Sequence, residues 1–413
     1  MKPIKFLLLS IIITTEIFAG GGSVYTRFGI GDLRLSFSAR RLAMGELGIA
    51  LSDKDYLSYL NPAGWNEMRL TRFETGALYS GNQSQNSSSS VYQTNVSFNG
   101  MMFGFPIDRE LGISIATGLV PVSNVGYEIS QPLKEPLVDE LKLSYTGQGG
   151  LSKFFIGASY RLPFDFSLGL TYDYYYGRIE NTTKVEFVQG SNLRDVSFRE
   201  ETSYNGMGFT AGIISGDLSK HIGTNSIKDL KIGFVFSSGV PLGSDSVNNS
   251  LTTIGTITTS TGSVKTNLPL KFGIGTSFRL FENYTFITDY LFQPFSGFTV
   301  SGVKSTNLQN FYKASLGFEY RDVGTRSDSF WDHIMLRGGL SYEQLQYKIN
   351  NTGLSQFSIY AGLSLPLSFD NAIDLAFQYG RRGTTDKNLL LDNIFKFSVS
   401  LSIGEIWFIR QER

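Results

Sequence analysis

Residues 395–403 read Phe-Lys-Phe-Ser-Val-Ser-Leu-Ser-Ile, so large apolar side chains alternate with Lys and Ser. The alternation recurs along the chain, as where Phe272, Ile274 and Phe278 flank small residues. A period of two is typical of β-strands with two unlike faces. Here one face carries Phe, Leu, Ile and Tyr, and the other carries mostly Gly, Ser, Ala and Thr. This division predicts strands with lipid on one side and a polar lumen on the other, as in a transmembrane β-barrel.

The alternating segments number fourteen, and an even number suits a closed antiparallel barrel. A soluble propeller or sandwich also has many strands, but such strands are shorter and rarely set Phe and Leu so regularly opposite Gly and Ser. The predicted barrel occupies residues 71–408. Its strands are 71–79, 91–105, 110–120, 141–161, 164–177, 195–214, 229–240, 268–281, 284–294, 311–320, 333–347, 354–365, 372–380 and 394–403.

The connections between these strands alternate in length. Residues 121–140, 178–194 and 241–267 are long and rich in Ser, Asn and Thr, whereas 106–109, 162–163 and 282–283 are short. Long loops on one rim and tight turns on the other are typical of outer-membrane barrels. The pattern predicts that the chain enters the barrel from the periplasmic side.

The first residues favour export. Lys2 and Lys5 precede an apolar run, and Ala19 is a suitable last residue before cleavage, so 1–19 reads as a secretory signal peptide. The apolar run is too short to cross ~30 Å of hydrocarbon. Together with the two-faced strands, this segment predicts a protein of the bacterial outer membrane, in contact with its lipid.

Several function classes are excluded. The net charge is +0, so no electrostatic attraction to nucleic acid is expected. The chain has no cysteine and only His221 and His333, which lack the spacing of a metal site or a catalytic pair. The sequence therefore predicts no metal, no cofactor and no enzymatic activity.

Residues 20–70 lack alternation and mix charged residues with Leu, Ala and Gly. Ser36 or Ser38 is suited to cap a short helix running to Leu47, and Asn61 followed by Pro62 predicts a helical turn over 62–68. A fourteen-stranded barrel has an interior that is either filled or left as a channel. We therefore expect 20–70 to form a plug, or hatch, of short helices inside the lumen.

The hatch motifs resemble the start of the FadL/TodX family of outer-membrane transporters of hydrophobic compounds. The resemblance lies in Ser-Ala-Arg-Arg-Leu-Ala-Met-Gly at 38–45, Gly-Ile-Ala-Leu at 48–51 and Leu-Asn-Pro-Ala-Gly at 60–64, with Glu46 where the family has a small residue. The opening at 25–32 and the ending are similar to divergent members found in Bacteroidota. The resemblance assigns the hatch motif to Arg40, Arg41, Asn61, Pro62, Ala63 and Gly64.

The resemblance implies a fourteen-stranded barrel that releases its substrate through a gap at a kinked third strand. At the end of the third predicted strand, 110–120, and just beyond it, Gly118, Pro121 and Gly126 interrupt pairing, because proline removes a donor and glycine marks bulges. These residues form either a gate or simply the end of the strand.

Charged residues and one glutamine on the small-residue face are expected in the lumen. They have two open roles, which are to seat the hatch against Arg40 and Arg41 or to bind the carboxylate of a ligand. The set is Asp165, Asp173, Lys271, Arg279, Lys313, Glu319, Asp374, Gln378 and Lys396.

Two functions follow as hypotheses. The first is a channel for passive uptake of hydrophobic or amphipathic small molecules such as long-chain fatty acids. The second is an accessory or docking protein for secreted, surface or periplasmic proteins, since one fold hosts several functions.

Overall fold

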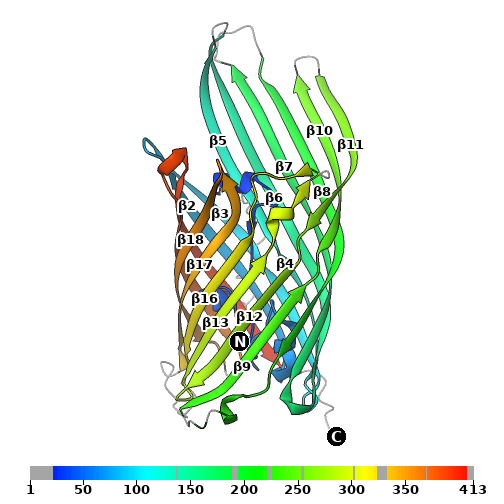
Figure 1. Ribbon diagram of the computed structural model, residues 1–413, viewed down its shortest axis with the longest axis vertical. Coiled ribbons are helices and arrows are strands. Elements are labelled where there is room, and N and C mark those ends of the chain that lie inside the picture. The colour runs from blue at the N-terminus through cyan, green and yellow to red at the C-terminus, as the bar shows by residue number, and fades with distance from the viewer. Residues whose placement is uncertain are drawn as a thin grey trace, which may run out of the picture.

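The computed structural model describes residues 22–135, 138–187, 194–221, 223, 226–252, 255–300, 303–322, 333–368 and 370–406. The predicted signal peptide and the last two residues of the predicted barrel lie outside these ranges. The described chain forms a closed, antiparallel barrel of fourteen strands, which confirms the predicted fold class. Pairing of the first barrel strand with the last, with Glu74 opposite Ser402, closes the barrel (Figure 1).

Three of the fourteen barrel strands consist of two segments each, namely β4 with β5, β9 with β10 and β11 with β12. The barrel segments are β2 (Thr71–Gln85), β3 (Ser90–Asp108), β4 (Ile113–Pro121), β5 (Ser123–Glu135), β6 (Val138–Arg161), β7 (Ser167–Phe187), β8 (Val196–Ile214), β9 (Ile227–Ser237), β10 (Val240–Thr252), β11 (Gly255–Leu268), β12 (Lys271–Leu280), β13 (Tyr284–Gln293), β16 (Phe311–Tyr320), β17 (Met335–Ile349), β18 (Thr352–Pro366), β19 (Ala372–Gly383) and β20 (Leu391–Glu405). The connections carry β14 (Thr299–Val300), β15 (Val303–Lys304) and the 3₁₀ turns η4 (Pro163–Asp165), η5 (Ser219–His221), η6 (Phe295–Gly297) and η8 (Asp386–Asn388).

The predicted two-faced pattern sets the orientation of the side chains. Along β7, Tyr172 and Tyr174 point outward and are 53% and 38% exposed, whereas Tyr175 between Tyr174 and Tyr176 is buried inside the barrel. Outward-facing side chains such as Ile274 and Phe397 are likewise exposed. The outer surface is therefore apolar and aromatic, which fits contact with lipid rather than a dry protein interior.

The long loops predicted at 121–140, 178–194 and 241–267 are largely β-strand, so this part of the prediction is wrong. β5 with β6, β7 with β8, and β10 with β11 form hairpins that rise above the other strands at the upper rim in Figure 1. We call this projection the upper wall. Its outer face carries ion pairs such as Arg199–Glu180 at 2.6 Å and Lys142–Glu186 at 3.5 Å.

Strand length separates the upper wall from the band that meets lipid. β12, β13 and β16 have 10 residues each, whereas β6 has 24. With a rise of ~3.4 Å per residue and a tilt of roughly 40°, ten residues span about 26 Å, close to the apolar band of such barrels. β6 spans more than twice that height, so the upper wall projects beyond the bilayer.

Residues 22–70 lie inside the barrel, where Figure 1 shows them in blue, and are called the hatch below. Their elements are η2 (Val24–Arg27), β1 (Asp32–Leu33), α2 (Ala39–Ala43) and η3 (Pro62–Glu67). Ser38 caps α2 as expected, but the helix ends at Ala43 rather than at Leu47. It stops there because Gly45 and Glu46 both have positive φ, at 85° and 75°.

Candidate functional site: the hatch and the break in the barrel wall

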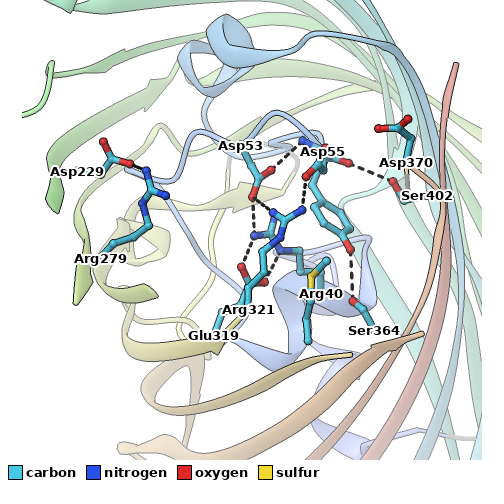
Figure 2. Close-up of polar contacts among 12 residues, drawn as sticks. Arg40, Asp53, Asp55, Asp229, Arg279, Glu319, Arg321, Ser364, Asp370 and Ser402 are labelled. Carbon is cyan, nitrogen blue, oxygen red and sulfur yellow. Dashed lines mark hydrogen bonds and ion pairs between the residues drawn. The ribbon is translucent and has the colours of Figure 1, made fainter. Parts of the chain in front are cut away.

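A buried ion-pair network joins the hatch to the barrel wall (Figure 2). Arg40 is 1% exposed, and its Nε and Nη2 donate to the two carboxylate oxygens of Glu319 at 2.8 and 2.7 Å. Its Nη2 also lies 2.7 Å from Asp53 Oδ2. On the barrel side, Arg337 donates to Glu319 at 2.6 Å and to Asp374 at 2.8 Å. Two guanidinium groups thus bind three carboxylates in a low-dielectric interior, where such charge-assisted contacts are strong.

A second group of contacts holds the hatch at the lower rim. Asp55 pairs with Arg72 at 2.8 Å. It also pairs with Arg321, and its carbonyl accepts from Ser402 Oγ at 3.3 Å (Figure 2). These partners belong to the first strand, the last strand and the segment after β16. The hatch is therefore attached across the seam where the barrel closes.

Glu46, the departure from the FadL/TodX pattern, has a specific partner set. Its carboxylate pairs with Lys313 and lies 3.4 Å from Lys396 Nζ, while Lys313 also lies 3.3 Å from Glu343. Two of the predicted lumen lysines are thus brought together by one hatch carboxylate. Sequence reasoning noted Glu46 only as an exception and did not expect this contact.

Acidification should loosen this contact. Burial alone would raise the pKa of the Glu46 carboxyl, but Lys313 and Lys396 lower it from 4.5 to about 2. A lowered folded pKa means that the stabilisation is fully present above pH 4.5 and is lost as pH falls toward 2. At full loss the shift corresponds to about 3 kcal/mol. We expect Trp65 fluorescence, in a variant with no other tryptophan, to shift to the red across this window.

Glu46→Gln is the matched control for the acid titration. It keeps the shape of the side chain and removes its charge at every pH. In this variant the Trp65 emission should already be shifted to the red at neutral pH. Its wavelength should change less between pH 4.5 and 2 than in the protein with Glu46. Identical titrations of the two proteins would contradict the role of Glu46.

The Asn61–Gly64 motif anchors the hatch against three neighbouring strands. Asn61 Oδ1 accepts from the Ala63 N–H at 3.0 Å and so caps η3, as predicted. Its Nδ2 donates to the Ile49 carbonyl at 2.8 Å and to the Phe234 carbonyl of β9 at 3.3 Å. One amide therefore caps a turn, braces the hatch and contacts the wall.

The small residues on the lumen face are required for this close fit. A Cβ on Gly212 would lie 1.8 Å from Asn61 Oδ1, and one on Gly169 would lie 2.3 Å from the Ala63 nitrogen. Both distances are far below van der Waals contact. The glycines of the lumen face thus leave the space into which the hatch backbone packs.

Asp289 was not singled out from the sequence. Its two oxygens accept from the Gly48 and Ile49 backbone N–H groups, each at 2.9 Å. The available signal was a carboxylate on the small-residue face, next to outward-facing Tyr290. Such a residue needs donors, and the hatch supplies them.

Some predicted lumen charges do not contact the hatch. Arg279 pairs with Asp229 at the lower rim (Figure 2), and Asp165 is exposed in the turn η4 rather than on a strand. Lys271 makes no ion pair with the described residues.

Arg41, in the hatch itself, is buried, but its two Nη atoms have no hydrogen-bond partner among the described residues.

The remaining members of the predicted set lie inside the barrel. Asp173 pairs with Lys153 at 3.3 Å, and Gln378 donates to Ser358 at 3.1 Å.

The barrel wall is interrupted beside the third strand. β3 pairs with β4 from Met101 downward, but the structure records no pairing between residues 90–99 of β3 and β5. Pro121 ends β4, Gly118 lies within β4, and Gly126 lies on β5. Pro121 and Gly126 therefore border this interruption, which we call the lateral gap, whereas Gly118 lies below it and pairs with Met102 on β3 and Phe155 on β6.

Arg34 of the hatch spans the base of the lateral gap. Its backbone N–H donates to the Val122 carbonyl at 2.8 Å, between β4 and β5. Its guanidinium donates to Asn99 Oδ1 at 3.2 Å and to Ser97 Oγ at 3.0 Å, both on β3. Burial lowers the pKa of Arg34 to about 10, so the group remains charged at neutral pH. Within the described residues, no carboxylate lies at ion-pair distance from it.

A cavity of about 100 Å³ lies between the hatch and the wall beside the lateral gap. It is lined by polar groups that include Arg34, Asn95, Asn99, Asn124 and Lys396. Pockets for drug-sized ligands have roughly 300–1,000 Å³. The cavity therefore admits part of a small molecule unless the hatch moves.

The described residues lack two further kinds of feature. They contain no cluster of His, Cys, Asp and Glu suited to hold a metal ion. They also contain no helix with the length and apolar character needed to cross a bilayer.

Solved structures show the same fold. The Pseudomonas putida toluene transporter TodX aligns with a TM-score of 0.62 at 14% identity, over 90% of this chain and 99% of that chain. A Pseudomonas aeruginosa FadL homologue aligns with a TM-score of 0.62 at 11% identity, over 91% and 99%. The Ralstonia pickettii toluene transporter TbuX gives 0.58 at 14% identity, over 90% and 99%.

The sequence itself gives a closer assignment. No curated protein sequence matches the chain. A family model described as BamG matches residues 1–412, nearly the entire chain. The chain forms a FadL-type barrel whose hatch is held by buried ion pairs, and its sequence makes it a member of the BamG family.

Proposed function

We propose that this protein is an outer-membrane channel for passive uptake of hydrophobic or amphipathic small molecules, with long-chain fatty acids as the favoured class. The observation that carries the proposal is the lateral gap beside β3 and β5. Toluene transporters and a FadL homologue share the fold, which supports the same class of substrate. A gap in the wall offers an apolar molecule an exit into the membrane without crossing the aqueous lumen.

Arg34 favours an anionic head group. Its neighbours Asn99 and Ser97 are neutral acceptors, so its charge is uncompensated at ion-pair distance within the described residues. A carboxylate bound to a partly desolvated guanidinium forms a strong, charge-assisted contact. A fatty acid would then place its head at Arg34 and its tail toward the lateral gap. Because the cavity holds only about 100 Å³, entry of a complete chain requires the hatch to shift.

Uptake of a fluorescent long-chain fatty acid into proteoliposomes tests this function. The natural chain lacks cysteine, so a Gln93→Cys, Glu128→Cys pair can be joined by a short bifunctional thiol reagent. Gln93 Nε2 already lies 3.3 Å from the Glu128 carbonyl across the gap. Cross-linking should reduce the initial uptake rate about tenfold, because the exit is closed.

The matched control places the same cross-link between Thr276→Cys and Thr288→Cys, which face each other on paired strands β12 and β13. This link should leave uptake unchanged. Equal rates for the two cross-linked proteins would reject the lateral exit. Uptake no faster than in protein-free liposomes would reject the channel.

The upper wall supports a second function, docking of a secreted or surface protein. Its hairpins project well beyond the length needed to cross a bilayer, and a small-molecule channel has no need of that height. The inner side of the wall is half-buried and partly apolar, with Ile129 and Tyr145 packed beside the core cluster that contains Tyr127. This observation favours contact with a macromolecule outside the membrane.

A further inference from the structure

Two strand edges face the lateral gap, and the structure records no pairing of one with the other. β3 pairs with β2 from Ser90 to Gly104, but no described strand pairs with its other edge from residue 90 to residue 99. β5 pairs with β6, and its other edge pairs only with β1, at Ser123 and Asn124. Between the two edges the structure records one side-chain contact, from Gln93 to the Glu128 carbonyl.

A free edge in a barrel wall is energetically costly. An exposed strand edge presents unpaired N–H and C=O groups that can pair with another chain, and within hydrocarbon each such group costs several kcal/mol. Exposed edges are usually blunted by proline or charged residues. β5 has both, at Pro132 and Glu128, but residues 90–99 of β3 have neither. An acyl chain cannot satisfy these groups, because it has no hydrogen-bond donor or acceptor.

The hatch already uses the β5 edge as a pairing surface. Asp32 and Leu33 add to it as the short antiparallel strand β1. Farther along, Thr26 Oγ1 accepts from the Gly126 N–H at 3.2 Å and donates to the Gly126 carbonyl at 3.0 Å. The gap is therefore built to receive backbone hydrogen bonds, and the β3 side of it is left open.

The free β3 edge has two distinct faces. Toward the lumen lie Gln93, Asn95, Ser97 and Asn99, while the outward-facing Tyr92, Val96 and Phe98 are 54%, 42% and 52% exposed. A strand added here must carry polar side chains on one face and apolar side chains on the other.

We propose that residues 90–99 of β3 bind an extended segment of a partner polypeptide by β-strand addition. The segment would have alternating polar and apolar residues, with its apolar face on the outside of the barrel beside Val96 and Phe98. Main-chain hydrogen bonds would supply affinity, and the alternation would supply register. This inference goes beyond uptake of small molecules and gives the docking function a specific site.

A defined peptide tests the proposal. The probe has the sequence of β4, residues 113–121, with Thr117→Cys, because β4 is the natural partner of the lower half of β3. The full chain is prepared as Val96→Cys, on the free edge. The control is Ile274→Cys on β12, which is 51% exposed and pairs on both sides, with β9 and β13. Disulfide yield is measured in detergent micelles or lipid nanodiscs.

We expect at least about tenfold more disulfide with Val96→Cys than with Ile274→Cys, the ratio expected from a few ladder hydrogen bonds. The same peptide with N-methylated backbone nitrogens should fall to the control yield, because it keeps the side chains and loses the donors. Equal yields at the two positions, no loss on N-methylation, or no disulfide at all would each overturn strand addition. Fatty-acid uptake is measured separately and reports only on the channel.

Discussion

Removal of residues 22–70 should turn the barrel into an open pore. The strand ladder from β2 to β20 does not depend on the hatch, which adds only the two-residue strand β1 to it. The lumen of a fourteen-stranded barrel is wider than that of an eight-stranded barrel, whose side chains fill it. We expect leakage of a small dye from liposomes to rise about tenfold or more.

The control deletion removes residues 244–263 from the β10–β11 hairpin, which lies in the upper wall and not in the lumen. It should not leak. An unchanged leak after removal of 22–70, in a protein that still inserts, would show that the hatch is not the seal. Insertion is checked by the heat-dependent gel shift typical of folded barrels.

The Glu319→Ala variant should release the hatch without removing it. The substitution takes away the carboxylate shared by Arg40 and Arg337, and both guanidinium groups are almost fully buried. Breaking a buried pair costs about 3–5 kcal/mol, because the remaining charge is left uncompensated. We expect a loss of this size in the free energy of hatch release, followed by Trp65 fluorescence during urea titration.

Glu282→Ala provides the matched control, since its partner Lys228 is 51% exposed and Glu282 itself is 56% exposed. An exposed pair contributes about 0–1 kcal/mol, so the free energy of hatch release in the control should be close to that of the unaltered protein. If Glu319→Ala also changes the free energy by less than about 1 kcal/mol, the network does not hold the hatch. If deletion of the hatch prevents folding, dye leakage through the Glu319→Ala variant still tests whether the hatch is the seal.

Much of the barrel could be predicted, because lipid and lumen impose opposite demands on alternate residues. The ends of β12, β13 and β16 agree with the predicted segments to within a few residues. The strands of the upper wall were missed, since residues 241–267 are rich in Ser, Thr and Asn. In the upper wall the outer face meets water instead of lipid. Polar side chains therefore occur on both faces there, and the apolar–polar alternation used for the prediction is lost.

The hatch shows a similar division. Local signals identified the cap at Asn61 and gave Ser38 as one of two candidates with Ser36, because an N-cap depends on neighbouring residues alone. The positive φ of Glu46, which helps end α2, left no such signal. The pairing of Arg40 with Glu319 joins residues 279 positions apart, so no local pattern could reveal it.

The sequence by itself determined the class of fold, the number of strands and the presence of an internal segment, since these follow from side-chain periodicity and local capping. Tertiary structure decided which lumen charges hold the hatch, where the wall is open and which edge is left without a partner. Those features depend on the register between distant strands and on the path of the hatch. Both are set by the packing of the complete barrel.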